Sequence, residues 1–135
     1  MREIKFRAWW SACTRMVKVI FIDFEKQDSD IEYIGDATEY PIARRSKLSE
    51  LVLMQFTGLK DKNGKEIYEG DVVKDRDAKI AYVTFLLQEM GFVLVYEKYD
   101  TRLGHRNTRS EYNQDLNLKV VGNIYENSEL LEAEK

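Results

Sequence analysis

The sequence predicts a mainly β protein of one domain, built from short antiparallel strands. Stretches rich in β-branched and aromatic residues either alternate between apolar and polar positions or are apolar throughout, which is typical of half-buried and buried strands. Turn signals containing glycine, asparagine or aspartate separate these stretches at short intervals. The length of 135 residues fits one domain over residues 1–135, and 44% apolar residues suffice for a core.

The first two predicted strands form an N-terminal hairpin. Residues 3–9 alternate between apolar and charged side chains, and residues 15–24 are apolar on both faces, as expected for a covered strand. Residues 9–14 supply the turn. A tryptophan pair at a strand end caps a core or an interface more often than it stacks on nucleic-acid bases. We therefore expect Trp9 and Trp10 to be candidate interface residues.

The stretch from Leu53 to Lys74 organises the middle of the chain. Asn63-Gly64 is the dipeptide best suited to a tight hairpin turn, because both residues tolerate positive φ angles. A second reversal follows at Gly70-Asp71, and a further strand begins directly after it. The simpler explanation of these turns is that they close hairpins. The alternative is that they form a binding loop.

Residues from about 25 to 40 are strongly acidic and predict an exposed connection, which can hold a short strand at residues 31–34. Clustered carboxylates can hold calcium, but the 28–30 segment lacks the spaced oxygens and the glycine of a calcium-binding loop. A solvated acidic connection is therefore favoured. In the basic segment 44–47, Ser46 can cap one or two helical turns before the next strand.

The second half of the chain continues the β pattern. Residues 80–87 and 92–96 are strands that are apolar on both faces, with a glycine-containing turn between them. Residues 116–125 return as a strand in which Gly122 indicates a bulge, and a short helix follows Asn127. The order of strands and turns predicts a small bent antiparallel sheet or an SH3-like barrel, with an N-terminal hairpin and a short C-terminal helix.

A polar loop at about residues 98–114 is long for a compact domain, and loops of this length are often functional. Arginines bind phosphates and tyrosines stack on bases, so this loop is compatible with nucleic acid or another anionic partner. A solvated loop is the commoner explanation. The candidate binding residues are Tyr99, Arg102, His105, Arg106, Arg109 and Tyr112.

The sequence shows no catalytic constellation. Cys13 and His105 are the only cysteine and the only histidine, and neither lies in a motif, which disfavours a nucleophile–base pair and a histidine-based metal site. We expect no catalytic residue, no metal and no cofactor. The chain also lacks the ~20 apolar residues of a membrane span and the apolar core of a signal peptide. We therefore expect a soluble, cytoplasmic protein.

Three blocks of the sequence resemble the YopX family of small phage and prophage proteins. The blocks are residues 2–9 (Arg-Glu-Ile-Lys-Phe-Arg-Ala-Trp), 53–74 and 121–131. They match in order at the start, middle and end of the chain. Trp10 and Ser128 depart from the aspartate and the proline that the family usually has there. The resemblance implies a phage context and a largely β fold, and the family carries no established activity to transfer.

The resemblance and the missing catalytic motifs together predict a phage or prophage accessory protein that is not an enzyme. We expect a binding or protein-interaction module in the cytoplasm of the host bacterium. Its expected partners are a host or phage protein or a second copy of the chain, because Trp9, Trp10 and the two-faced apolar strands offer surface for self-association. The alternative is a nucleic-acid-binding module that uses the 98–114 loop. A net charge of −3 argues weakly against bulk electrostatic coating of nucleic acid.

Overall fold

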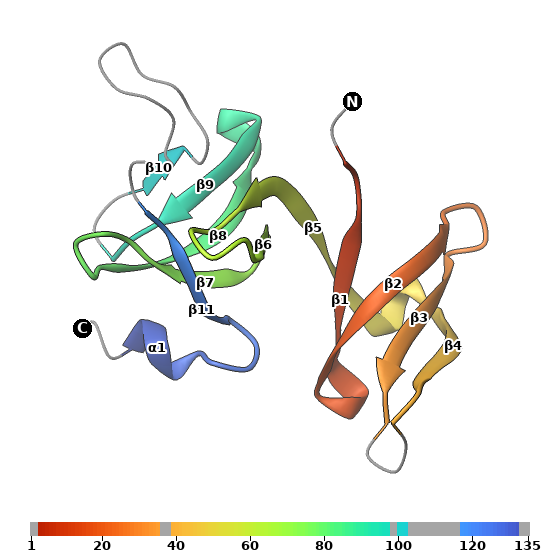
Figure 1. The fold of residues 1–135 in the computed structure, drawn as a ribbon. Coiled ribbons are helices and arrows are strands. Elements are labelled where there is room, and N and C mark those ends of the chain that lie inside the picture. The colour runs from red at the N-terminus through yellow and green to blue at the C-terminus, as the bar shows by residue number, and fades with distance from the viewer. Residues whose placement is uncertain (1–2, 36–38, 98–99, 103–116, 133–135) are drawn as a thin grey trace. The chain divides into compact units, whose positions relative to one another are not determined.

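A computed structural model describes residues 3–35, 39–97, 100–102 and 117–132 and shows a mainly β fold. The chain falls into two compact units, residues 1–56 and 57–135 (Figure 1). The first unit holds β1 (Phe6–Trp10), β2 (Arg15–Asp23), β3 (Asp28–Ile34), β4 (Pro41–Lys47) and the start of β5 (Leu51–Lys60). The second unit holds the end of β5, β6 (Glu66–Tyr68), β7 (Asp71–Lys74), β8 (Ile80–Leu86), β9 (Gly91–Val95), β10 (Asp100–Arg102), β11 (Lys119–Asn123) and the helix α1 (Glu129–Glu132).

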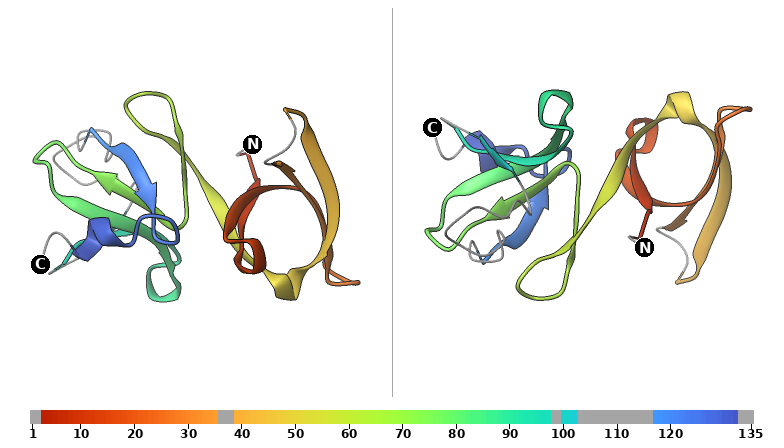
Figure 2. Two further views of the ribbon diagram at one scale, coloured as in Figure 1. Left: turned by 90° about the horizontal axis from the view of Figure 1, so that it is seen from below. Right: turned by 90° about the horizontal axis from the view of Figure 1, so that it is seen from above.

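One sheet has the strand order β4-β3-β2-β1-β5-β6. In the first unit, β1 pairs antiparallel with β2 and with β5, which confirms the predicted N-terminal hairpin. Ala8 lies opposite Val17 on one side and Leu53 on the other, so apolar side chains from three strands gather on one face. The end-on views show how strongly the strands of this unit curl (Figure 2). The core inside the curl consists of Ala8, Trp10, Val17, Ile31 and Leu51.

The other sheet has the strand order β10-β9-β8-β7-β11 and lies in the second unit. Its core consists of Ile67, Val73, Ala81, Val83, Leu94, Tyr96, Leu118 and Val120. Among the strands that the structure describes, no hydrogen-bonded pairing joins the two edges of either sheet. The mainly β prediction, its N-terminal hairpin and its short C-terminal helix are thus confirmed. Of the two predicted architectures, the bent sheet is found, and the described strands form no closed SH3-like barrel.

The acidic stretch at about 25–40 is not an exposed connection throughout, because residues 28–34 form β3, which is longer than the short strand expected at 31–34. This strand pairs with β2 and with β4. Ser29 and Ile31 are fully buried, while Asp28, Asp30 and Glu32 alternate with them on the other face. The carboxylates therefore occupy the solvated positions of a half-buried strand, which is compatible with a period of two.

The basic segment 44–47 also differs from the prediction. It is the end of β4, and the only helical structure that follows it is a one-turn 3-10 helix, Leu48–Glu50. Ser46 does not cap this turn, because it is buried within β4, where it pairs with Ser29 of β3. Pairing with β3 over seven residues outweighs the local capping preference of a serine.

Part of the predicted polar loop at 98–114 is also a strand, since Asp100–Arg102 form β10 and pair with β9. The rest of that loop lies outside the described residues. The prediction of a single domain over residues 1–135 stays a prediction.

The bulge predicted at Gly122 is confirmed, because the pairing of β11 with β7 shifts register between Val120 and Gly122. The side chain of Asn127 packs against this glycine and accepts a hydrogen bond of 3.1 Å from the Asn123 amide. A Cβ atom on residue 122 would lie 2.5 Å from Oδ1 of Asn127, well inside van der Waals contact. Only glycine fits at this position without moving its neighbour.

We expect Gly122→Ala to lower the free energy of unfolding by about 1–3 kcal/mol, because the added methyl group displaces Asn127. Gly91→Ala is the matched control, since its Cβ would meet nothing closer than 3.7 Å. Urea denaturation followed by circular dichroism measures both. Equal stability of the two variants would contradict the close approach at Gly122.

Two five-residue turns in the second unit have the same hydrogen bonds. In the 61–65 turn, the Asp61 amide donates to the Lys65 carbonyl oxygen and the Gly64 amide donates to the Asp61 carbonyl oxygen. In the 75–79 turn, the Asp75 amide donates to the Lys79 carbonyl oxygen and the Ala78 amide donates to the Asp75 carbonyl oxygen. The fourth residue has a positive φ in both, +84° at Gly64 and +64° at Ala78. Alanine is disfavoured in this conformation.

We expect Ala78→Gly to raise the free energy of unfolding by about 0.5–1 kcal/mol, and Gly64→Ala to lower it by about 1 kcal/mol. Each variant gives its turn the residue that the other turn has, so the two substitutions control each other. Urea denaturation of both variants tests this. A loss of stability in Ala78→Gly would show that the strain at residue 78 is not the dominant effect.

Candidate binding surfaces

Among the described residues of the second unit, the turn between β8 and β9 carries the most exposed large apolar side chains. Leu87 is 77% exposed and Met90 is 81% exposed. At the base of the turn, Phe85 and Phe92 lie opposite each other, with ring centres 5.4 Å apart in an edge-to-face arrangement. We call the two exposed residues Leu87 and Met90 the apolar tip.

The backbone at the apolar tip is strained. A 3-10 turn, Leu87–Glu89, ends at Met90, whose φ of 51° and ψ of 38° lie in the left-handed region. The Met90 amide closes the turn by donating a 3.1 Å hydrogen bond to the Leu87 carbonyl oxygen. Long side chains rarely adopt this conformation, and its cost is of the order of 1 kcal/mol.

The first unit contains the same kind of turn with small and polar residues. Between β1 and β2, the 3-10 turn Ser11–Cys13 ends at Thr14, whose φ is 47° and whose amide donates to the Ser11 carbonyl oxygen. Ser11 and Thr14 therefore stand where the apolar tip has Leu87 and Met90. The turn geometry does not require apolar residues, so the leucine and the methionine need another explanation.

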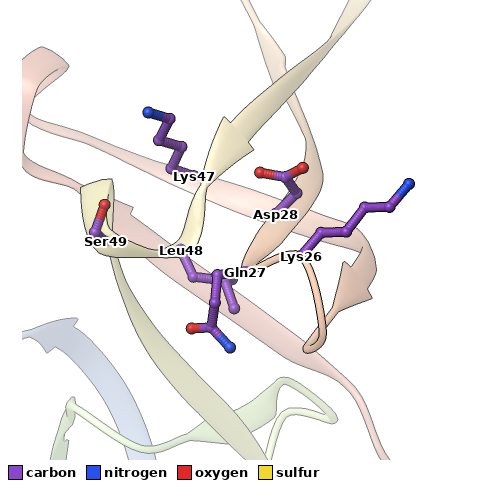
Figure 3. Close-up of a pocket in the computed structure, with 6 residues that line it drawn as sticks. All are labelled: Lys26, Gln27, Asp28, Lys47, Leu48 and Ser49. Carbon is purple, nitrogen blue, oxygen red and sulfur yellow. The ribbon is translucent and has the colours of Figure 1, made fainter.

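A depression of about 520 Å³ lies in the first unit, between the β2–β3 turn and the end of β4. Its lining residues are Lys26, Gln27, Asp28, Lys47, Leu48 and Ser49. The close-up shows the ammonium ends of Lys26 and Lys47 pointing apart, with the Asp28 carboxylate between them (Figure 3). The depression thus offers no converging set of donors to a small anion.

Three buried aspartates of the second unit hold turns. Asp61 accepts hydrogen bonds of 2.8, 2.9 and 2.9 Å from the amides of Asn63, Lys65 and Val120. Asp71 accepts one of 2.8 Å from the Tyr68 amide. Their carboxylates are therefore engaged with the backbone.

Asp75 repeats this arrangement in its own turn. Its Oδ1 atom accepts from the amides of Asp77 and Lys79, both at 2.9 Å. Its Oδ2 atom accepts a 2.9 Å hydrogen bond from the hydroxyl of Tyr96. The buried carboxylates thus have hydrogen-bond partners within the fold, and these hydrogen bonds account for their burial.

The two candidate interface residues have different environments. Trp10 is 3% exposed and packs against Tyr33 with ring centres 5.5 Å apart, so it belongs to the core of the first unit. Trp9, one residue earlier in β1, is only partly buried. Cys13 is exposed in the turn after β1 and is not the half-buried side chain that is usual for a free cysteine.

The candidate binding residues of the polar loop are not brought together by the described part of the chain. Arg102 is described only through its backbone, at the end of β10. Tyr99, His105, Arg106, Arg109 and Tyr112 lie outside the described residues. Within the described ranges, no group of three or more histidine, cysteine or acidic side chains could hold a metal ion. The described helices also include none long and apolar enough to cross a membrane.

The sequence contains a signal for the apolar tip. A turn is found between the two predicted strands, but it begins at Leu87, which the sequence predicts to be the last residue of the strand at 80–87. A methionine is unusual in such a turn. Large apolar residues at a position where glycine or polar residues suffice are the observation that could have identified Leu87 and Met90.

The three blocks that resemble the YopX family contact one another within the two units. Residues of the first block lie in β1 and pair with β5, which belongs to the second block. In the second unit, the Ile124 amide of the third block donates a 2.9 Å hydrogen bond to the Gly70 carbonyl oxygen of the second block. The blocks therefore mark strand pairings and turns, and the resemblance is one of fold.

Comparison with known proteins agrees with this conclusion. The family model described as YopX protein matches residues 5–132, so the chain belongs to the YopX family. The crystal structure of protein EF1440 from Enterococcus faecalis is similar, with a TM-score of 0.60 and 24% sequence identity. That similarity covers 97% of this chain and 99% of the other, and it shows a shared fold. No curated protein matches the chain.

The pKa of Asp61 gives a test of its role. Burial alone would raise this pKa, but the amides of Val120, Lys65 and Asn63 outweigh burial and hold the pKa below its usual value. The folded-state pKa is thus lower than the unfolded one. The carboxylate's contribution to stability is therefore complete above about pH 4 and is lost as the pH falls through the folded-state pKa.

We expect Asp61→Asn to lower the free energy of unfolding at neutral pH, because an amide cannot accept all three hydrogen bonds. The difference from the unsubstituted protein should begin to shrink at about pH 4, where the unfolded chain takes up a proton at Asp61, and should keep shrinking as the pH falls through the lower folded-state pKa. Urea denaturation across this pH range measures the difference. A difference that does not change with pH would rule out the ionised carboxylate as its cause.

Proposed function

We propose that this chain is a non-enzymatic phage or prophage accessory protein that works as a protein-interaction module, with the apolar tip as its binding surface. The observation that carries the proposal is Met90, a large apolar residue that is 81% exposed and strained in the left-handed conformation. Thr14 has the same left-handed conformation in the first unit, so the turn accounts for the strain, and the large exposed apolar side chain is the feature that a binding function explains.

The size and chemistry of the apolar tip suit a protein partner. Complete burial of a leucine or a methionine side chain contributes about 1.5–3 kcal/mol, so two such residues can anchor an interface. Methionine is flexible and adapts to irregular surfaces, and methionine and aromatic residues are enriched in protein interfaces. The paired rings of Phe85 and Phe92 give the tip an ordered base.

The non-enzymatic part of the proposal is supported by the buried carboxylates. Asp61, Asp71 and Asp75 are the buried acidic residues among those described, and each accepts hydrogen bonds that hold a turn. A general acid or base needs a proton-exchanging atom that faces a substrate, whereas these carboxylates accept hydrogen bonds from backbone amides and, at Asp75, from the Tyr96 hydroxyl.

We expect the double variant Leu87→Ser/Met90→Thr to lose its protein partner and keep its fold, because it copies the turn residues Ser11 and Thr14 of the first unit. Affinity capture from nuclease-treated lysate of the host bacterium should yield about tenfold less partner than with the unsubstituted protein. Thermal unfolding should still show a cooperative transition for the variant, because Thr14 adopts the same left-handed conformation at the corresponding position of the first unit.

Phe24→Ser is the matched control, because it removes a 65% exposed apolar side chain from the β2–β3 turn of the first unit. This variant should capture the partner normally. Unchanged capture by the Leu87→Ser/Met90→Thr protein would contradict the proposal. Material captured from untreated lysate but not from nuclease-treated lysate would instead favour nucleic acid as the partner. Light scattering across a dilution series would identify a second copy of the chain.

A further inference from the structure

Among the strands that the structure describes, β4 is a free edge of the sheet in the first unit. It stands first in the strand order and, among the described strands, it pairs only with β3. Five of its seven residues are exposed. In an antiparallel pair, alternate residues direct their amide and carbonyl groups away from the neighbouring strand. An extended peptide can therefore add to this edge as a further strand.

The charges of β3 and β4 form matching rows on one face. Lys47 lies opposite Asp28, and Arg45 lies opposite Asp30 with a 2.8 Å ion pair between Nε and Oδ1. A strand added to the far side of β4 would meet the same two cations. An added strand would therefore need carboxylates at alternate positions, as β3 has, in order to pair with these cations.

A third cation is placed on the other face of β4. Arg44 lies opposite the buried Ile31, and its guanidinium group stacks over the ring of Trp10 at 4.8 Å from the ring centre. Stacking leaves the N–H groups in the plane of the guanidinium available to an acceptor. The edge thus presents ordered positive charge above and below its backbone.

We propose that β4 binds an acidic extended segment of another protein as an added strand, with carboxylates at alternate positions facing Arg45 and Lys47. This inference deepens the proposed function and rests on it for the class of partner. Its surface lies in the first unit and shares no residue with the apolar tip.

The charge pattern disfavours other occupants. A second copy pairing through its own β4 would place arginines and lysines side by side, and like charges on neighbouring strands destabilise the pairing. A nucleic acid would bring phosphates close to Asp28, Asp30 and Glu32, which line the outer face of β3. An acidic peptide places its charges against β4 and continues the alternation of acidic and basic strands.

The test uses a fluorescein-labelled peptide that copies residues 28–34, Asp-Ser-Asp-Ile-Glu-Tyr-Ile, and a version with lysine at its three acidic positions. Fluorescence anisotropy should show that the protein binds the acidic peptide and not the lysine peptide. Arg45→Glu/Lys47→Glu should weaken binding of the acidic peptide about tenfold or more and should bind the lysine peptide instead. Lys119→Glu, an exposed change on β11, should bind the acidic peptide normally.

A second arm does not depend on any variant of the protein. N-methylation of alternate peptide residues removes the backbone donors that pair with β4 and should abolish binding. Amide hydrogen exchange of the unsubstituted protein should slow in β4 when the unmethylated peptide is added. Binding that survives both N-methylation and charge reversal, or the absence of binding, would overturn the inference.

The outcome is separable from that of the proposed function. The Leu87→Ser/Met90→Thr protein should bind the acidic peptide as the unsubstituted protein does. Failure of peptide binding together with partner capture through the apolar tip would remove only the β4 site. A labelled single-stranded oligonucleotide that competes for β4 at equal strength would also overturn the inference, because it would show a general anion site.

Discussion

The carboxylate of Asp61 is the interaction on which the second unit depends. It binds two amides of its own turn and the amide of Val120, which lies 59 residues further along the chain. The neighbouring Lys62 amide donates to the Leu118 carbonyl oxygen and reinforces the link. Leaving a buried amide unpaired costs about 1–3 kcal/mol, so one side chain both closes a hairpin and sets the position at which β11 begins.

Short polar side chains hold other parts of this unit in the same way. Asp75 repeats the turn of Asp61, and the amides of Tyr125 and Glu126 both donate to Oδ1 of Asn123. Asn127 then fills the space beside Gly122. These residues lie in or near the blocks that resemble the YopX family. The blocks therefore identify a fold because they contain the side chains that its turns require, and they carry no information about a ligand.

Most of the fold could be predicted from the sequence, because local chemistry fixes it. Asn63-Gly64 indicated a hairpin and Gly122 indicated a bulge, and both are found. β3 was expected only as a short strand at residues 31–34, because counting its carboxylates hid the alternation that Ser29 and Ile31 reveal. The pairing of β4 with β3 is non-local, and no pattern within residues 44–47 could have distinguished it from a short helix.

The candidate surfaces were less accessible to prediction. The exposure of Leu87 and Met90 depends on which side chains the folded sheet buries. The positive φ of Met90 is a backbone conformation that cannot be read from the sequence. The arginines at 44 and 45 were visible as a basic cluster. Their placement on opposite faces of a free edge follows only from the strand register.

Strand β5 runs without interruption through residue 56, where one compact unit ends and the other begins. Its first half pairs with β1, and its last residues pair with β6. Boundaries between independently inherited modules normally fall in linkers that can be lengthened or cut. Here a junction made by gene recombination would fall inside a paired strand, and inserting or deleting one residue there would reverse which side chains face the core. The two units should therefore be inherited together, and we expect related proteins to contain both units or neither.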